Sequence, residues 1–422
     1  MSDRSVDERA IRDRRAARSN VLLAGSLVFT VLSIALVAFA VKVGTPPRYY
    51  DEEAYLEIAR NISEGEGFSL NGVPTANRPP AWPLILAVCL VVGLPAGVLP
   101  AVSALLLVVG AIAAAYIGVH LSESRWGAVA GLLVLLYPLN VYSATTLYPQ
   151  TAATAILLLL WAIATRTAGR TSRRLPVAIS AVVGLLLAAL VLAVPTLILT
   201  GFAIGMWFWW QQRGNRLRYL AVAGICAAVP VLAWTARNSI ELDSPVMFST
   251  TSGWNLLQGN NAEATGDSGV TAEFPETVSA AAAMTEVERD AYYRDAAIDW
   301  ISSHPGDAAR LYGAKVINYF APYNAPATES QGGGAVRAIA IASFVAVGAA
   351  TVCRVLMRSR VPLRSTEWLF LTLFFANALT MAVFFTRTRF RQPLDNVLVV
   401  EAGVAVAIVI ALTVRQTRRH VG

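Results

Sequence analysis

Charged residues and cysteines are scarce in this chain of 422 residues. Asp, Glu, Lys and Arg make up 14% of the sequence, whereas hydrophobic residues make up 56%. Too few polar side chains remain to cover the surface of a globule of this length, so the composition argues against a soluble protein and indicates a membrane protein. The three cysteines, Cys89, Cys226 and Cys353, lie in apolar segments without the spacing of a metal site or a disulfide framework. We expect them to be packing residues.

Lysine is nearly absent, since only Lys42 and Lys315 accompany 32 arginines. The net charge of +7 does not indicate nucleic-acid binding, because the arginines stand in short clusters between apolar runs. Six arginines precede the first apolar run, which is followed by no small-residue cleavage pattern. This arrangement predicts an uncleaved signal anchor with its N-terminus in the cytoplasm.

Long apolar runs are abundant, and ten of them are candidates for membrane-spanning helices. They are Val21–Val43, Pro100–Leu121, Trp126–Pro138, Thr151–Ala164, Pro176–Ala193, Pro195–Trp210, Tyr219–Thr235, Ala335–Leu356, Trp368–Phe385 and Asn396–Val414. An eleventh run, Pro79–Gly93, would extend about 22 Å as a helix, less than the ~30 Å hydrocarbon core. If it crossed, the arginine clusters of the later loops would face outward. If it only dips into the outer leaflet, they all face the cytoplasm, as the positive-inside bias favours.

We therefore predict an all-α polytopic membrane protein with about ten transmembrane helices and both termini in the cytoplasm, located in the cell membrane. The predicted regions are a basic tail 1–20, an N-terminal transmembrane catalytic module 21–236 with an external loop 44–99, an external α-rich segment 237–334, C-terminal transmembrane helices 335–414 and a tail 415–422.

Acidic residues follow the first predicted span at once, in Tyr50-Asp51-Glu52-Glu53. Loops between membrane helices are usually short, so a long loop that holds carboxylates against the bilayer calls for a functional reason. A carboxylate in this position can act as a base on a substrate that stays dissolved in lipid. The sequence also offers an alternative, because acidic residues in the first turn of an interfacial helix favour the helix dipole. Glu52 in particular is open to either interpretation.

One basic cluster departs from the positive-inside pattern, with Arg387, Arg389 and Arg391 on the predicted outer surface. Guanidinium groups match phosphate oxygens bidentately and stay charged at any working pH. The alternative is headgroup binding or snorkelling. Glu401, ten residues after Arg391, is expected to pair with one of these arginines. A base for an acceptor hydroxyl and cations for a departing phosphate are what transfer of a sugar from a lipid-phosphate carrier requires.

Several motifs in chain order resemble those of the GT-C membrane glycosyltransferases. The first external loop carries three of them, Tyr50–Ala59, Gly65–Phe68 and Asn77–Pro83. Thr250–Asn261, His304-Pro305 and Arg389–Pro393 continue the likeness. The branch most similar to this chain comprises bacterial proteins like the protein mannosyltransferases and the lipid A aminoarabinose transferase.

The resemblance implies an inverting single displacement from a polyprenyl-phosphate monosaccharide to an acceptor on the external face. It implies Asp51 as catalytic aspartate, with Glu52 as a second candidate, Arg78 near the sugar phosphate, and Arg389 and Arg391 on the carrier phosphate. Arg387, Asn255 and Asn260 complete the predicted substrate-binding set, although Asn also marks ordinary turns. Relatives often carry an acid where this chain has Gln150, which weakens any proposal of a bound metal. Relatives also often have Arg where Val194 precedes Pro195, so one donor contact is expected to be missing.

No cofactor and no metal site are predicted. The expected partners are the lipid-linked donor, a glycan, lipid or protein acceptor, and membrane lipids, but not nucleic acid. Two alternatives from other classes remain, namely a lipid or solute transporter and a non-catalytic partner subunit of the same fold. Transporters usually place substrate groups near the midplane, where this sequence is almost free of charge.

Overall fold

The computed structural model describes residues 24–168, 176–212, 214–267, 274–324 and 333–421. In these ranges the secondary structure is helical except for one antiparallel hairpin, β1 (Ser69–Leu70) with β2 (Val73–Pro74), which pairs Leu70 with Val73. The apolar helices are Ala24–Val43, α4 (Pro100–Ser122), α5 (Val129–Leu136), α6 (Pro138–Ala144), α7 (Gln150–Thr167), α8 (Val177–Ala193), α9 (Ile198–Gln211), α10 (Arg216–Glu241), α15 (Gly334–Leu356), α16 (Ser365–Met381) and α17 (Thr388–Val421). The remaining helices are α2 (Tyr50–Glu64), α3 (Ala81–Val91), α11 (Ser252–Gly259), α12 (Pro275–Ala280), α13 (Glu286–Ser303) and α14 (Pro305–Tyr319), and the 3₁₀ turns are η1 (Ala96–Val98), η2 (Arg125–Ala128), η3 (Pro195–Leu197) and η5 (Met357–Ser359).

Helices occupy all ten positions at which membrane spans are predicted. Among the described residues, five helices are long and apolar enough to cross a membrane by themselves, or six if a bent pair counts as one span. That pair consists of Arg125–Leu136 and Pro138–Ala144, which meet at an angle of 54°. Pro138 lacks a backbone N–H and clashes with the preceding turn, so the helix breaks there. The fold is therefore that of an all-α polytopic membrane protein, as predicted.

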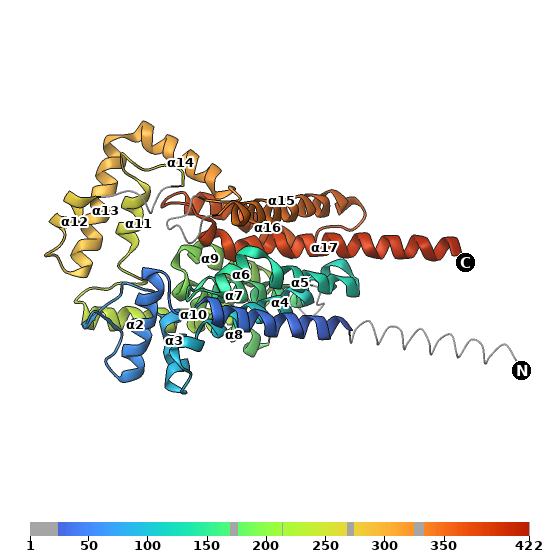
Figure 1. The fold of residues 1–422 in the computed structure, drawn as a ribbon, viewed down its shortest axis with the longest axis horizontal. Coiled ribbons are helices and arrows are strands. Elements are labelled where there is room, and N and C mark those ends of the chain that lie inside the picture. The colour runs from blue at the N-terminus through green and yellow to red at the C-terminus, as the bar shows by residue number, and fades with distance from the viewer. Residues whose placement is uncertain (1–23, 169–175, 213, 268–273, 325–332, 422) are drawn as a thin grey trace, which may run out of the picture.

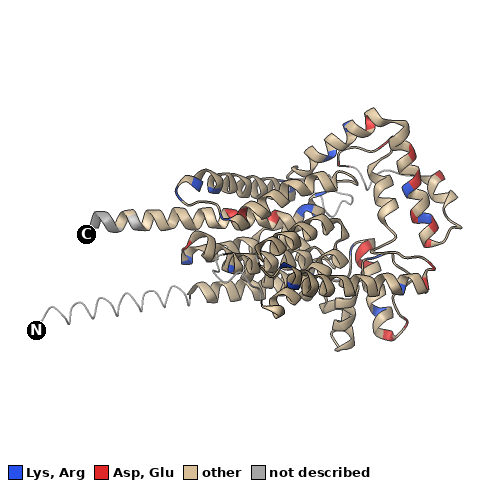
Figure 2. Ribbon diagram, turned by 180° about the vertical axis from the view of Figure 1, so that it is seen from behind, with Lys and Arg blue, Asp and Glu red and all other residues tan. Residues whose placement is uncertain are grey.

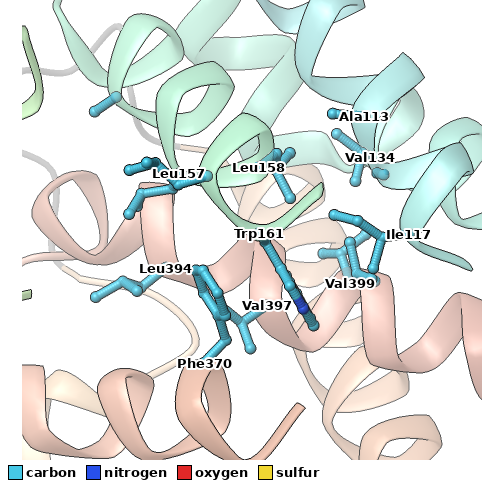
Figure 3. Close-up of a cluster of buried hydrophobic side chains, with 14 of the residues drawn as sticks. Ala113, Ile117, Val134, Leu157, Leu158, Trp161, Phe370, Leu394, Val397 and Val399 are labelled. Atoms are coloured by element: carbon cyan, nitrogen blue, oxygen red, sulfur yellow. The ribbon is translucent and has the colours of Figure 1, made fainter. Parts of the chain in front are cut away.

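The core of the bundle is formed by α4, α5, α7, α16 and α17. Trp161 of α7 has no exposed surface and stacks on Phe370 of α16 with ring centroids 4.7 Å apart, surrounded by aliphatic side chains (Figure 3). Gly403 of α17 packs against Ala130 so closely that an added Cβ would lie 2.5 Å from the Ala130 Cα. Small residues of this kind let membrane helices approach each other, since no hydrophobic driving force acts between them in lipid.

Other helices expose apolar side chains over most of their length, as helices in contact with lipid do. Only 11% of the apolar window is buried in Ala24–Val43 and in α15, and 17% in α10. Exposed residues such as Leu217, Ile240 and Leu356 would be unfavourable in water. These helices form the periphery of the bundle.

Both ends of the described chain lie at one end of the bundle, and α11–α14 lie at the other (Figure 1). Acidic and basic residues are numerous at this α11–α14 end (Figure 2). The segment that contains α3 leaves the bundle and returns to it at the same end. Thr45, just after the first apolar helix, donates a hydrogen bond to the carbonyl of Gly97, just before α4. With 11 residues, α3 extends about 16 Å and is too short to cross. This geometry agrees with a Pro79–Gly93 segment that dips in and returns.

The prediction that Glu401 pairs with the outer arginines is wrong. Its carboxylate lies 3.8 Å from Arg354, which also forms a 2.6 Å ion pair with Glu367, and all three side chains have no exposed surface. Ten residues of helix separate Glu401 from Arg391 by about 15 Å, too far for an ion pair. The cluster instead joins α15, α16 and α17 near the end of the bundle opposite α11–α14.

Candidate functional site

Helix α2 places Asp51 at the end of the bundle where α11–α14 lie. The helix begins at Tyr50, directly after Tyr49 in an extended conformation, so Asp51, Glu52 and Glu53 all fall in its first turn. Negative charge there interacts favourably with the unpaired N–H groups of the helix. Gly65 ends the helix in the left-handed conformation with φ of 87°, which glycine adopts without steric cost. The Asp51 side chain remains 32% exposed.

Two arginines from distant parts of the chain meet at Asp51. Oδ1 of Asp51 lies 2.7 Å from Nη2 of Arg78, and Oδ2 lies 3.2 Å from Nη1 of Arg389. Arg78 follows the hairpin, and Arg389 lies in the first turn of α17. Three of the predicted site residues are thus brought together, with a carboxylate between two guanidinium groups.

Aromatic rings hold both guanidinium groups in place. The Arg389 guanidinium lies 4.5 Å from the centroid of the Tyr148 ring, and Tyr148 stacks on Tyr49 with an interplanar angle of 9°. Arg78 lies 5.6 Å from the Tyr55 ring centroid. Cation–π contacts at partly desolvated positions stabilise a fixed arginine orientation. Tyr148 and Tyr49 were not predicted as site residues.

The other two predicted arginines point elsewhere. Arg391 is 1% exposed, forms a 2.6 Å ion pair with Asp395 one turn later, and donates to the backbone carbonyls of Tyr319 and Ala321. Arg387 donates to the carbonyl of Asp267 at 3.3 Å. The three arginines therefore do not form one cluster, because successive odd positions at a helix start point in different directions.

The predicted asparagines lie in and after α11, and their described contacts are structural. Asn260 donates to the carbonyls of Leu256 and Val383, and its Oδ1 accepts from Lys315. Asn255 lies within α11 and is half-buried. No hydrogen bond joins Asn255 or Asn260 to Asp51, Arg78 or Arg389 in the described part of the chain.

Glu52 is fully buried beside the catalytic candidate. Burial raises the pKa of its carboxyl to about 7, against the opposing charge of Arg48 and the nearby backbone amides of Leu147 and Arg48. Neither carboxylate oxygen has a hydrogen-bond partner of normal geometry among the described residues. A carboxyl that titrates near neutral pH next to a site is a functional candidate on physical grounds.

The chain is similar in structure to ArnT from Cupriavidus metallidurans. The crystal structure of ArnT bound to undecaprenyl phosphate matches with 15% identity and a TM-score of 0.45, and the apo structure matches with 15% identity and a TM-score of 0.42. Each alignment covers 91% of this chain and 78% of the ArnT chain. No protein family and no curated protein matches the sequence.

Two residues that sequence reasoning missed fasten the segments that carry Arg78 and Arg389. Glu286, at the start of α13, accepts hydrogen bonds from the Thr75 hydroxyl at 2.6 Å, the Ala76 amide at 2.8 Å and the Thr250 hydroxyl. Lys315 has no exposed surface, and its ammonium donates to the carbonyls of Gly259 and Phe384 and to Asn260 Oδ1. Burial lowers the pKa of Lys315 to about 8. Its rarity was the one available signal, because the chain has only two lysines.

Gln150, at the start of α7, is 5% exposed, and its Oε1 has no partner among the described residues. The described residues contain no group of three or more His, Cys, Asp or Glu side chains placed to hold a metal ion.

Proposed function

We propose that this protein is a membrane glycosyltransferase that moves a monosaccharide from a polyprenyl-phosphate carrier to an acceptor on the external face of the cell membrane. The observation that carries the proposal is the contact of Asp51 with Arg78 and Arg389. The Asp51 carboxylate, which can accept a proton, lies 2.7 Å from Arg78 and 3.2 Å from Arg389 at the end of an apolar bundle, and both guanidinium groups are suited to bind phosphate. The polyprenyl tail would run between the helices, and the reaction would take place on the side of α11–α14.

The ion pairs suggest how the site changes partners during transfer. A sugar phosphodiester carries one negative charge, and the phosphate monoester that leaves carries more. As the bond from the anomeric carbon to the phosphate oxygen breaks, its electron pair stays on the phosphate, and Arg389 shifts from Asp51 Oδ2 to that growing charge. Interactions that strengthen in the transition state are the ones that accelerate the reaction.

The same exchange frees Asp51 for its own role. Oδ2 of Asp51, released by Arg389, takes the proton of the acceptor hydroxyl while the acceptor oxygen attacks the anomeric carbon. Attack from the side opposite the phosphate inverts the configuration. Arg78, held against Tyr55, keeps Asp51 oriented through Oδ1 and stays near the sugar phosphate. General base catalysis by a positioned carboxylate contributes typically about 10²–10⁴-fold.

We assign Arg391 to positioning and not to phosphate binding. Moving it toward a phosphate would leave Asp395, which is 1% exposed, as an unpaired buried charge. Breaking a buried ion pair costs roughly 3–5 kcal/mol, more than one exposed phosphate contact returns. Arg391 instead joins α17 to the end of α14 through the Tyr319 and Ala321 carbonyls. Arg387 has the same kind of supporting role next to Asp267.

The experiment is incubation of the purified full chain with synthetic polyprenyl-phosphate mannose or arabinofuranose and a panel of envelope glycan acceptors. Glycosylated acceptor and released polyprenyl phosphate should appear together in equal amounts. A transporter would move the lipid without releasing the phosphate, so intact donor in every reaction would refute the proposal.

The product lipid gives a second measurement that does not depend on the acceptor. Undecaprenyl phosphate, the lipid in the ArnT structure, should bind the wild type and bind Arg389→Ala at least tenfold more weakly. Arg60→Ala, which removes an exposed arginine elsewhere on α2, is the matched control and should bind normally. Equal affinity of Arg389→Ala and Arg60→Ala would remove Arg389 from the phosphate site.

A further inference from the structure

A cavity of about 440 Å³ lies at the far end of α2 from Asp51. Its walls come from the end of α2, the β1–β2 hairpin, α3 and the end of α10, and include Glu66, Phe68, Leu84, Trp234, Arg237 and Glu241. This volume falls within the range of small-molecule sites, roughly 300–1,000 Å³. The elements around it lie at the same end of the bundle as α11 (Figure 1).

The charges of the cavity walls differ in kind from those around Asp51. The Arg237 guanidinium uses three of its five N–H donors on the carbonyls of Phe68 and Thr75 and on Asn238 Oδ1, and it lies 5.5 and 5.3 Å from the ring centroids of Phe68 and Trp234. Glu66 and Glu241 are exposed and form no ion pair within the described ranges. Two carboxylates and one guanidinium line the cavity beside apolar side chains, so its walls carry a net negative charge, which suits hydroxyl donors and disfavours a phosphate.

The cavity and the Asp51 site share one structural element. Arg237 binds the two carbonyls at the ends of the hairpin, those of Phe68 and Thr75, and Glu286 binds the Thr75 hydroxyl and the Ala76 amide. Arg78 follows two residues later. A ligand that contacts the hairpin therefore has a fixed position relative to Arg78. Along α2 it is about 22 Å from Asp51, which is the length of 15 helical residues.

We propose that this cavity binds a sugar unit of the acceptor, several units away from the hydroxyl that is glycosylated. The inference rests on the proposed function, and it names the acceptor class as an extended oligosaccharide. A monosaccharide in the cavity could not reach Asp51, whereas a chain of sugars could cross the hairpin from the cavity to Asp51. Carboxylates that accept sugar hydroxyls, together with apolar side chains, provide the recognition.

The first test is direct binding and needs no turnover. Mannotetraose and arabinotetraose are added to the full chain in detergent, and saturation-transfer NMR reports contact. At least one should bind, and the double variant Glu66→Gln with Glu241→Gln should bind it roughly tenfold more weakly, as expected for loss of hydrogen bonds to charged groups. Glu64→Gln, an exposed position on α2 outside the cavity wall, is the matched control.

The second test compares acceptors of different length in the transfer assay. The wild type should use tetrasaccharides at least tenfold better than methyl monosaccharides, and the double variant should lose this preference while undecaprenyl phosphate affinity is unchanged. Absence of binding by both tetrasaccharides, binding that the double variant retains, or equal use of short and long acceptors would overturn the proposal. If no donor is consumed but a tetrasaccharide binds in the cavity, the proposed transfer reaction fails and the sugar site stands.

Discussion

At the scale of single residues, charge pairing decides which of several plausible side chains form the site. Arg389 and Arg391 are two positions apart and identical in type, yet Arg389 meets Asp51 while Arg391 is buried against Asp395. Asp51 and Glu52 are adjacent, yet one is partly exposed between two cations and the other is enclosed. In each pair the two side chains point in different directions from the first turn of their helix, and this difference gives them different surroundings.

Replacing Asp51 by Asn should lower transfer roughly 10²–10⁴-fold, because the amide keeps the shape but cannot accept the proton. Undecaprenyl phosphate should bind this variant more tightly than the wild type, since Arg389 no longer has a competing carboxylate. Turnover and lipid affinity are measured on the same preparation, with Glu53→Gln as the exposed neighbouring control. A variant with more than about a tenth of wild-type turnover would take Asp51 out of the mechanism.

The raised pKa of Glu52 leads us to predict that the stability of the fold depends on pH. Its pKa is about 7 in the folded protein and near 4.5 when exposed, so the folded state holds a proton that the unfolded state lacks between these values. Stability is then present at low pH and is lost as the pH rises toward and through 7. Glu52→Gln cannot ionise, so it should melt at a higher temperature than the wild type at pH 8, with a much smaller difference at pH 5. Equal differences at both pH values would contradict the assigned pKa.

At the scale of elements, the start of α17 is held by contacts with α14 and with the end of α11. Lys315 of α14 donates to the Phe384 carbonyl, and Asn260 after α11 donates to the Val383 carbonyl, so both fix the turn that leads to Arg389. Each of these acceptors is a neutral oxygen. The buried ammonium therefore contributes by satisfying three acceptors and not by an ion pair.

Gly259 tests this attachment, because a Cβ added there would lie 1.9 Å from the Phe384 carbonyl oxygen. Gly259→Ala should push α11 away from the turn before α17, lower the melting temperature and weaken undecaprenyl phosphate binding severalfold. Gly313→Ala in α14 is the control, since a Cβ there meets nothing within 4 Å and alanine favours a helix. Normal lipid affinity in Gly259→Ala would show that Arg389 does not depend on this contact.

At the scale of the whole molecule, the two ends of the described chain and α11–α14 lie at opposite ends of the bundle, as Figure 1 shows. If the arginine-rich loops face the cytoplasm, as the positive-inside bias predicts, then α11–α14 lie on the external side. Ser172, in a loop predicted to be cytoplasmic, and Ser268, in the segment predicted to be external, lie outside the described residues. Ser279 at the α12 end and Ser359 in η5 replace them as probes.

Single cysteines at these positions, in a background without Cys89, Cys226 and Cys353, should report the side of the membrane. In intact cells a membrane-impermeant thiol reagent should label Ser279→Cys and leave Ser359→Cys unlabelled until the cells are permeabilised. The reverse pattern would place α11–α14 in the cytoplasm. It would also exclude an outer surface as the place of transfer.

The sequence by itself determined the elements. Apolar runs located the helices of the bundle except α6, which begins at Pro138 where a predicted run ends. The shortness of the Pro79–Gly93 run, together with the arginine pattern, predicts that it does not cross. These features depend on hydrophobicity and backbone chemistry over a few consecutive residues, which are visible in the chain. Asp51 and Arg389 were also identifiable as charged groups next to predicted spans, and Arg78 through the resemblance of its motif. The ion pair of Arg391 with Asp395 was visible in principle, because the two residues are spaced i and i+4 on one helix.

Only the tertiary structure decided which charges meet. Asp51 and Arg389 are 338 residues apart, and Thr75 and Glu286 are 211 apart, so no local period relates them. Glu401 shows the same limit, since proximity in sequence favoured the outer arginines and the fold gave it Arg354. In a bundle with a nearly uncharged interior, each buried charge must find a partner wherever helix packing places one, and that packing is set by the whole chain.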